Sequence, residues 1–235
     1  MTGPPAPPDR ALVTGIVLAG GAGTRFGAGR SKAWLTDAAG DTLLSLALAS
    51  LVRVARILVV VAPREVALPP LRVAATSPGD VEPPDHLAVH VPDLAAGEGP
   101  LAGLVPGLEL AAGTFRSPLA FVLAVDMPRF TPGEFACLAA PLEARPGAVA
   151  VVPRTPRGLE PLFACVRPAA VAPVLRTAWE RGERAGHGAF EALGPGLLAL
   201  DTTDPAAWPG GPGRLRSINV PADLPAVLYG DGATT

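Results

Sequence analysis

The chain is poor in cysteine and histidine, the residues on which disulfide-rich and zinc-binding proteins depend. Its 235 residues include two cysteines, Cys137 and Cys165, which lie far apart and form no CxxC pair. The three histidines show no metal-ligand spacing. We therefore interpret the cysteines as small core hydrophobes in a reducing compartment, which argues against a disulfide scaffold or a zinc module.

Long apolar runs and charge excess are lacking as well. No uninterrupted apolar run reaches about 18 residues, so the sequence predicts no membrane span. The net charge is −2 and no basic run stands out, which gives no electrostatic reason to expect a nucleic acid or a membrane surface as partner. The opening MTGPPAPPDR is proline-rich and lacks the apolar stretch of a signal peptide. We expect a cytoplasmic protein.

What the chain has in abundance is apolar sequence divided by proline and glycine. Apolar residues make up 49%, with 29 prolines and 27 glycines at loop-like intervals. Apolar runs typical of buried strands alternate with helical patterns, which predicts a three-layer α/β/α fold with a Rossmann-like, mostly parallel sheet. We expect strands at 56–62, 87–91, 119–125, 149–152, 162–166 and 197–200, and a loop over 153–161. The expected organisation is a flexible leader over 1–10, one domain over 11–230 and a flexible tail over 231–235.

A glycine-rich, cationic loop follows the first apolar run. Residues 20–32 read GGAGTRFGAGRSK and include Arg25 and Lys32, the chain's only lysine. Glycines let backbone N–H groups approach phosphate oxygens, and cations offset their charge. Ala33 after Lys32 departs from the Walker A pattern, and Phe26 departs from G-x-G-x-x-G. The sequence therefore argues against a Walker A ATPase and against a hydride-transfer enzyme.

Two aspartates follow later strands. Asp93 is succeeded by Gly97 and Gly99, and Asp126 ends the most apolar run of the chain. Ligands of open parallel sheets bind at the carboxyl edge of the strands, where both would lie. Either aspartate could instead cap a following segment, and a glycine-rich turn can be purely structural. A carboxylate at the end of a buried strand needs a partner, and Mg²⁺ takes one or two carboxylates together with phosphate oxygens.

These residues resemble a known family. The stretch LAGGAGTRFGAGRSK is similar to the signature L-A-[AG]-G-x-G-x-R-[MF]-G-x…K of the MobA-like nucleotidyltransferases, which include molybdenum cofactor guanylyltransferases and their cytidylyl and sugar-nucleotide relatives. Further matches occur in order along nearly the whole chain: Asp93 with GPLAG at 99–103, VDMP at 125–128, EPLF at 160–163, GER at 182–184 and SINVPADL at 217–224.

The resemblance implies a role for each matched position. The positions implied to bind the nucleotide, its base and ribose first and its phosphates after, are Leu18, Ala19, Gly20, Gly21, Gly23, Lys32, Asp93 and Asp126. Those implied to act in catalysis are Arg25, Lys32 and Asp126, with Asp126 as the Mg²⁺ ligand. Those implied to lie at the acceptor side are Arg154, Glu160, Arg184 and Asn219.

By this resemblance we expect a Mg²⁺-dependent enzyme that transfers GMP from GTP to the phosphate of molybdopterin and releases pyrophosphate, with possible contacts to proteins that make or receive the molybdenum cofactor. Alternatives are a CTP-dependent enzyme, a sugar phosphate or other phosphorylated acceptor, and a non-catalytic nucleotide- or cofactor-binding protein of the same fold. Departures from the pattern fall at the residues before the lysine (Arg30-Ser31), at the base-reading asparagine (Val61 or Ala62 here) and at the acceptor side (Ser217 and Glu160).

Overall fold

A computed structural model describes residues 8–20, 31–65, 67–68, 86–128, 130–208, 215–218 and 223. The described residues form one eight-stranded sheet of order β3-β2-β1-β4-β7-β5-β6, with β8 pairing on β5. The strands are β1 (Val13–Leu18), β2 (Ile57–Ala62), β3 (Leu87–Pro92), β4 (Leu119–Ala124), β5 (Ala150–Thr155), β6 (Gly158–Leu159), β7 (Phe163–Val166) and β8 (Leu197–Asp201).

Most of the sheet is parallel. Strands β1 to β4 run in one direction, and β8 runs parallel to β5, whereas β7 is antiparallel to both β4 and β5. Two reversals across β7 return β5 to the direction of β4, so the carboxyl ends of β1 to β5 and of β8 lie at one edge of the sheet. In open parallel sheets this edge is where ligands bind.

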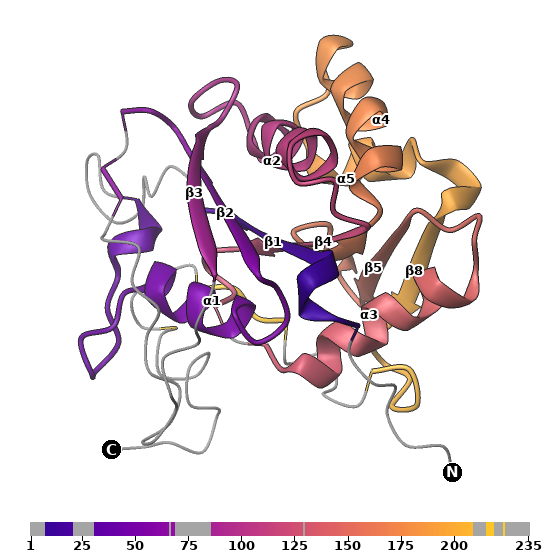
Figure 1. Cartoon of the computed structure of the whole chain (residues 1–235), viewed down its shortest axis with the longest axis horizontal. Helices are drawn as coiled ribbons and strands as arrows, with labels where there is room; N and C mark the ends of the chain where they lie inside the picture. Colours follow the sequence, from indigo (N-terminus) through magenta and orange to yellow (C-terminus); the bar gives the residue numbers. More distant parts are fainter. Residues whose placement is uncertain are drawn as a thin grey trace.

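Helices cover both faces of the sheet (Figure 1). The helical elements are η1 (Arg10–Leu12), η3 (Lys32–Trp34), α1 (Leu43–Leu51), α2 (Leu101–Gly113), α3 (Pro132–Ala144), α4 (Pro168–Glu180), α5 (Gly186–Glu191) and η4 (Gly194–Gly196). Helices α1 and α3 lie on one side of the sheet, and α2, α4 and α5 lie on the other (Figure 1). The predicted three-layer, mostly parallel fold is therefore confirmed.

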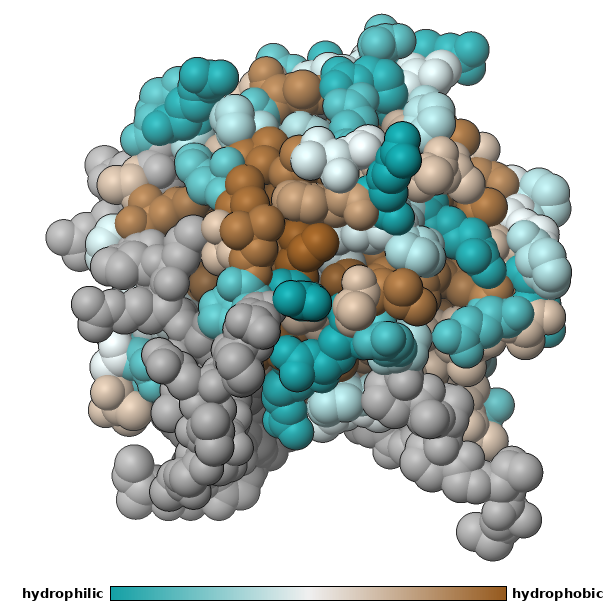
Figure 2. Space-filling model, in the orientation of Figure 1, coloured by the Kyte–Doolittle hydropathy of each residue, from teal (hydrophilic) through white to brown (hydrophobic). Residues whose placement is uncertain are grey.

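The core divides in the same way. One cluster of buried side chains joins α1 and α3 to the sheet, and a second joins α2, α4 and α5 to its other face. Four phenylalanines pack together in the first cluster, where the Phe121 ring centroid lies 4.7 to 5.1 Å from those of Phe130, Phe135 and Phe163. In the space-filling view, hydrophobic residues form a band across the middle of the face shown, between hydrophilic margins (Figure 2).

Helices α1 and α3 begin with side-chain caps. The Thr42 side chain accepts a hydrogen bond from the Ser45 N–H at the start of α1. Thr131 and Glu134 form a reciprocal capping box around Pro132 at the start of α3. Among the described residues, none of the helices combines the length and the apolar character needed to cross a bilayer.

The predicted loop at 153–161 is wrong in part. Strand β5 continues to Thr155 and turns back into β6, with Thr155 paired to Gly158 and Arg154 to Leu159. Gly158 adopts a positive φ of 126°, which the tight turn requires. The sequence PRTPRG carries two prolines and three polar residues, so it contains no apolar alternation that would reveal a two-residue strand.

Candidate active site

A pocket of about 350 Å³ opens at the carboxyl edge of the sheet. Its walls come from the ends of β1, β2 and β4, from the loop 93–100 after β3 and from the first turn of α2. The lining includes an apolar part and a polar part, formed by Leu18, Gly20, Lys32, Val61, Asp93 and Asp126 among others. Residues far apart in the sequence are thus brought together in one site, as the parallel strand arrangement predicted.

Gly20 and Asp93 lie against each other in this pocket. A Cβ atom added at Gly20 would stand 2.7 Å from Cδ of Pro63 and 3.3 Å from Oδ2 of Asp93. The Asp93 N–H donates to the carbonyl of Ala62 at 3.2 Å, which holds the aspartate at the end of β3. Partial burial, with the nearby Glu65 carboxylate as a smaller cause, raises the pKa of Asp93. A desolvated carboxylate with a perturbed pKa in a cleft is typical of a functional site.

The loop after Asp93 is tied to α2 through a proline. Pro106 lies inside α2 and has no N–H to donate to the carbonyl of Ala102, four residues earlier. The N–H of Leu94 donates to that carbonyl instead, at 2.9 Å. The Ala102 carbonyl, which Pro106 leaves without a helical donor, therefore accepts the hydrogen bond that fixes Leu94 next to Asp93.

Lys32 is held in place by the residue before it. The Ser31 hydroxyl donates to the carbonyl of Ala19 at 2.7 Å and accepts from the N–H of Ala33 at 3.2 Å, so Ser31 is the N-cap of η3. Ser31 is buried, at 7% exposed. This bond closes the two ends of the glycine-rich segment on each other and places Lys32 beside the end of β1.

The Lys32 ammonium group lies between two parts of the site. Its Nζ donates to Oδ2 of Asp126 at 2.7 Å and to the carbonyl of Ile218 at 2.9 Å. The N–H of Ile218 in turn donates to the carbonyl of Asp126 at 2.9 Å. Both charged side chains are mostly shielded, at 18% and 20% exposed. The turn η3, the segment that follows β4 and the segment 215–218 therefore meet at one ion pair.

Not every predicted site residue lines the pocket. Leu18, Gly20, Lys32, Asp93 and Asp126 line it. Ala19 is fully buried beside it, with its N–H donating to the Val61 carbonyl and its own carbonyl accepting from Ser31. Predictions for Gly21, Gly23, Arg25 and Asn219 fall outside the described residues.

The described residues predicted to bind the acceptor are more dispersed. The backbone of Arg154 lies at the carboxyl end of β5, where its carbonyl accepts from the N–H and hydroxyl of Thr202. Glu160 accepts from the Thr155 hydroxyl at 3.3 Å and lies two residues before Leu162, which lines the pocket. The side chain of Arg184 packs on Trp179. Their roles at an acceptor stay predictions.

Three site residues were missed by sequence reasoning. Ser31 entered only as a departure from the family pattern, although a serine directly before a short helical turn is a recognisable N-cap signal. Ile218 contributes its backbone carbonyl, which no residue type could reveal. Glu65 acts on Asp93 only through proximity. Among the described residues, no group of three or more histidine, cysteine, aspartate or glutamate side chains could hold a metal by itself.

Solved structures share the fold of this chain. The chain is similar to a nucleotidyl transferase from Methanothermobacter thermautotrophicus, with TM-score 0.59, 19% identity and coverage of 90% of this chain and 94% of that one. It is also similar to the 2-C-methyl-D-erythritol 4-phosphate cytidylyltransferase of Thermus thermophilus, with TM-score 0.53, 20% identity and coverage of 89% and 94%. These likenesses show the nucleotidyltransferase fold.

The sequence comparisons give the family. Residues 15–195 match the MobA-like NTP transferase domain. A probable molybdenum cofactor guanylyltransferase of Chloroflexus aggregans is 32% identical over 234 residues, which cover 97% of this chain and 99% of that protein. The chain therefore belongs to the MobA-like NTP transferase family and is a nucleotidyltransferase, as its motifs predicted.

Proposed function

We propose that this enzyme transfers GMP from GTP to the terminal phosphate of molybdopterin and releases pyrophosphate. The observation that carries the proposal is the ion pair of Lys32 with Asp126 in a pocket that Gly20 and Asp93 also line. That arrangement offers a cation for phosphate oxygens and a carboxylate for a metal at the same place. The name of the Chloroflexus relative supports guanylyl transfer and this acceptor.

The pocket suits a nucleoside. Leu18, Val61 and Leu162 supply apolar surface for a base, and Gly103 keeps the helix backbone close to the pocket. Gly20 has no room for a side chain, because a Cβ atom there would stand 2.7 Å from Pro63. Packing against Pro63 and Asp93 therefore requires glycine at this position. The preference for guanine over cytosine rests on the double glycine and the GPLAG stretch of the sequence and on the name of the Chloroflexus relative.

The donor set fits Mg²⁺. Asp126 and Asp93 place two carboxylates on one pocket, and Mg²⁺ typically takes one or two protein carboxylates and completes its shell with phosphate oxygens and water. Asp126 would hold the ion, which when bound supplies positive charge near the triphosphate.

The reaction requires no covalent enzyme intermediate. An oxygen of the acceptor phosphate forms a bond to the α-phosphorus of GTP, while the bond to the bridging oxygen breaks and pyrophosphate leaves with that electron pair. The chain contributes position and charge: Lys32 would pair with phosphate oxygens, and the loop 93–100 would hold the nucleoside. In this proposal Lys32 exchanges Asp126 for phosphate oxygens within the pocket that both residues line.

The test is a nucleotide competition. The purified protein is incubated with molybdopterin, Mg²⁺ and each of the four ribonucleoside triphosphates labelled at the α-phosphate, and labelled dinucleotide and pyrophosphate are measured. We expect labelled product from GTP in preference to the others, and none when the metal is chelated. A preference for CTP would refute guanylyl transfer. Turnover with a sugar phosphate in place of molybdopterin would refute the acceptor, and nucleotide binding without turnover on any acceptor would indicate a binding protein.

A further inference from the structure

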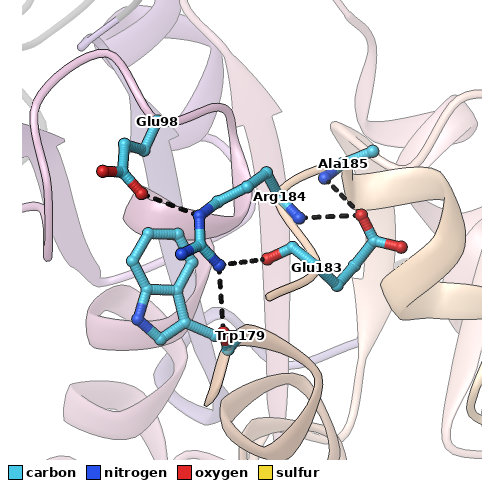
Figure 3. A network of polar contacts seen from close by, with 5 residues as sticks. All are labelled: Glu98, Trp179, Glu183, Arg184 and Ala185. Carbon is cyan, nitrogen blue, oxygen red and sulfur yellow. Dashed lines mark hydrogen bonds and ion pairs between the residues drawn. The ribbon is translucent and has the colours of Figure 1, made fainter. Parts of the chain in front are cut away.

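The guanidinium group of Arg184 is partly exposed and contacts partners from two segments (Figure 3). Its central carbon lies 3.9 Å from the centroid of the Trp179 ring, and its Nε donates to Oε2 of Glu98 at 2.7 Å. Its Nη1 donates to the carbonyls of Trp179 at 3.0 Å and of Glu183 at 2.9 Å. The group thus joins the end of α4 to the loop before α2.

The main chain at Arg184 contacts the same loop. Its carbonyl accepts from the N–H of Leu101, the first residue of α2, at 3.3 Å. A Cβ atom at Gly99 would stand 2.6 Å from that carbonyl oxygen, so the two backbones touch as closely as glycine allows. Gly99 also has a positive φ of 87°, which glycine adopts without strain.

The turn that presents Arg184 is itself fixed. Oε1 of Glu183 accepts from the N–H groups of Arg184 and Ala185, at 2.7 and 2.8 Å. These hydrogen bonds lower the pKa of Glu183, because they favour its charged form. Figure 3 shows Glu183 folded back over its own turn while Arg184 reaches the opposite way to Glu98.

The loop held by this contact forms a wall of the nucleotide pocket. Gly97, Gly99 and Pro100 line the pocket with Asp93. The loop is anchored at its beginning by Leu94 on the Ala102 carbonyl and at its end by Arg184. Two glycines with positive φ lie near the second anchor, so the loop backbone there has few steric restraints of its own.

We infer that Arg184 is a positioning residue of the nucleotide pocket, which acts through Glu98 and Gly99 instead of binding the acceptor directly. The inference rests on the proposed function in one respect, which is that this pocket holds the nucleotide. Its basis is geometric: Nε and Nη1 point at protein partners, one face of the guanidinium lies on Trp179, and the carbonyl meets the loop. Lysine cannot reproduce the planar fork or the stacking, so arginine is required here.

The experiment compares Arg184→Lys and Glu98→Gln with the wild-type protein and with Arg181→Lys, an exposed arginine of the same turn, as the matched control. Three quantities are measured: the Kd for GTP by equilibrium dialysis, the KM values for GTP and for the acceptor, and amide hydrogen exchange over 94–103 without any ligand. We expect both variants to raise the Kd and KM for GTP about three- to tenfold, as suits the loss of an exposed ion pair or a cation–π contact. Exchange over 94–103 should rise, and the acceptor KM should stay within about twofold, within the range of a change that breaks no direct contact.

The possible results separate this inference from the proposed function. A rise in acceptor KM with unchanged GTP affinity would make Arg184 an acceptor ligand and overturn the inference. Unchanged exchange over 94–103, or raised exchange with unchanged GTP affinity, would overturn it as well. If the wild-type protein binds no nucleoside triphosphate, the proposed function fails, and the exchange measurement still decides whether Arg184 orders the loop. Amide exchange over α3 serves as the measure of global unfolding. If Arg184→Lys raises exchange over α3, the conclusion is drawn from Glu98→Gln alone.

Discussion

Lys32 and Asp126 lie 94 residues apart in the sequence and form an ion pair of 2.7 Å in the pocket at the carboxyl edge of the sheet. Each neutralises the other in a place where both are mostly shielded from solvent. Removal of one partner leaves a shielded charge without its counter-charge, which is costly. The pair therefore places a cation and a carboxylate side by side in the pocket where we propose that phosphate and metal bind.

The first prediction concerns this pair. Lys32→Met and Asp126→Asn should each lower kcat at least about 10²-fold, by analogy with the loss of one donor that stabilises transition-state charge. The KM for GTP should change less, since the charges act most strongly in the transition state. Steady-state kinetics check this, with Arg53→Met, at an exposed position of the chain, as the control. A fall in kcat of less than about threefold in both variants would contradict a catalytic role.

The second prediction uses the lysine content of the chain. Lys32 is the only lysine, so among amines an acylating reagent such as acetic anhydride can modify only this side chain and the N-terminal amine, and it removes the positive charge of each. We expect modification of Lys32 to abolish turnover. We expect GTP with Mg²⁺ to protect Lys32 from the reagent, because the ammonium group would then be paired with phosphate oxygens. Mass spectrometry of peptides that contain residue 32 measures both effects. Full activity in a protein modified at Lys32 would contradict the prediction.

The sequence was sufficient to pick out Lys32, Asp93 and Asp126, because the type of each side chain suggests its chemistry. A lone lysine after a glycine-rich turn, and aspartates after apolar runs, point to phosphate and metal without any coordinates. Their meeting was also predictable from the sequence, because parallel strands end at a common edge. The alternation of strands and helices sufficed for the fold class in the same way.

The sequence could not predict contacts made by the backbone. The carbonyl of Ile218 on Lys32 and that of Arg184 against Gly99 carry no signature in residue type. Arg184 itself was expected to face the acceptor, yet its described contacts run to Trp179 and Glu98. The hairpin of β5 and β6 escaped prediction because a two-residue strand, Gly158–Leu159, is too short to show a period.

The third prediction concerns Ser31. Ser31→Ala should lower the free energy of unfolding by about 1–3 kcal/mol, because the buried carbonyl of Ala19 and the N–H of Ala33 would both lose their partner. It should also lower kcat, since the turn η3 that carries Lys32 would lose its N-cap and its hydrogen bond to the end of β1. Urea denaturation and kinetics measure the two effects. Ser31→Thr keeps the hydroxyl and serves as the control; equal stability of Ser31→Ala and wild type would refute this role.

The fourth prediction concerns the pH dependence of stability through Asp93. The pKa of Asp93 is raised above its usual 3.8 in the folded protein, mainly by burial. A raised carboxyl pKa means that the charged form is disfavoured in the folded state, so Asp93 lowers stability above this pKa and has no such effect once it is protonated in both states. Asp93→Asn should therefore be more stable than wild type at about pH 7. The difference should shrink as the pH falls through the raised pKa of Asp93 and should be gone below the usual 3.8.

Urea denaturation at a series of pH values measures this difference, and GTP binding is followed in parallel. We expect Asp93→Asn to bind GTP more weakly while it unfolds at higher urea, which is the exchange of stability for function typical of a binding site. Glu65→Gln is a milder companion variant, since Glu65 is the smaller cause of the raised pKa. A stability difference that grows toward acid would contradict the sign argued here.

The last prediction separates backbone strain from backbone contact in the pocket loop. Gly97 and Gly99 have nearly equal positive φ angles, 77° and 87°, and both line the pocket. A Cβ atom at Gly97 meets nothing within 4 Å, whereas one at Gly99 would stand 2.6 Å from the carbonyl oxygen of Arg184.

Gly97→Ala should therefore cost only the strain of the left-handed conformation, roughly 1–2 kcal/mol of unfolding free energy. Gly99→Ala should cost this strain plus a displacement of the loop, and should weaken GTP binding more than Gly97→Ala does. Equal losses of stability and affinity in the two variants would mean that the close approach of Gly99 to Arg184 does not shape the pocket.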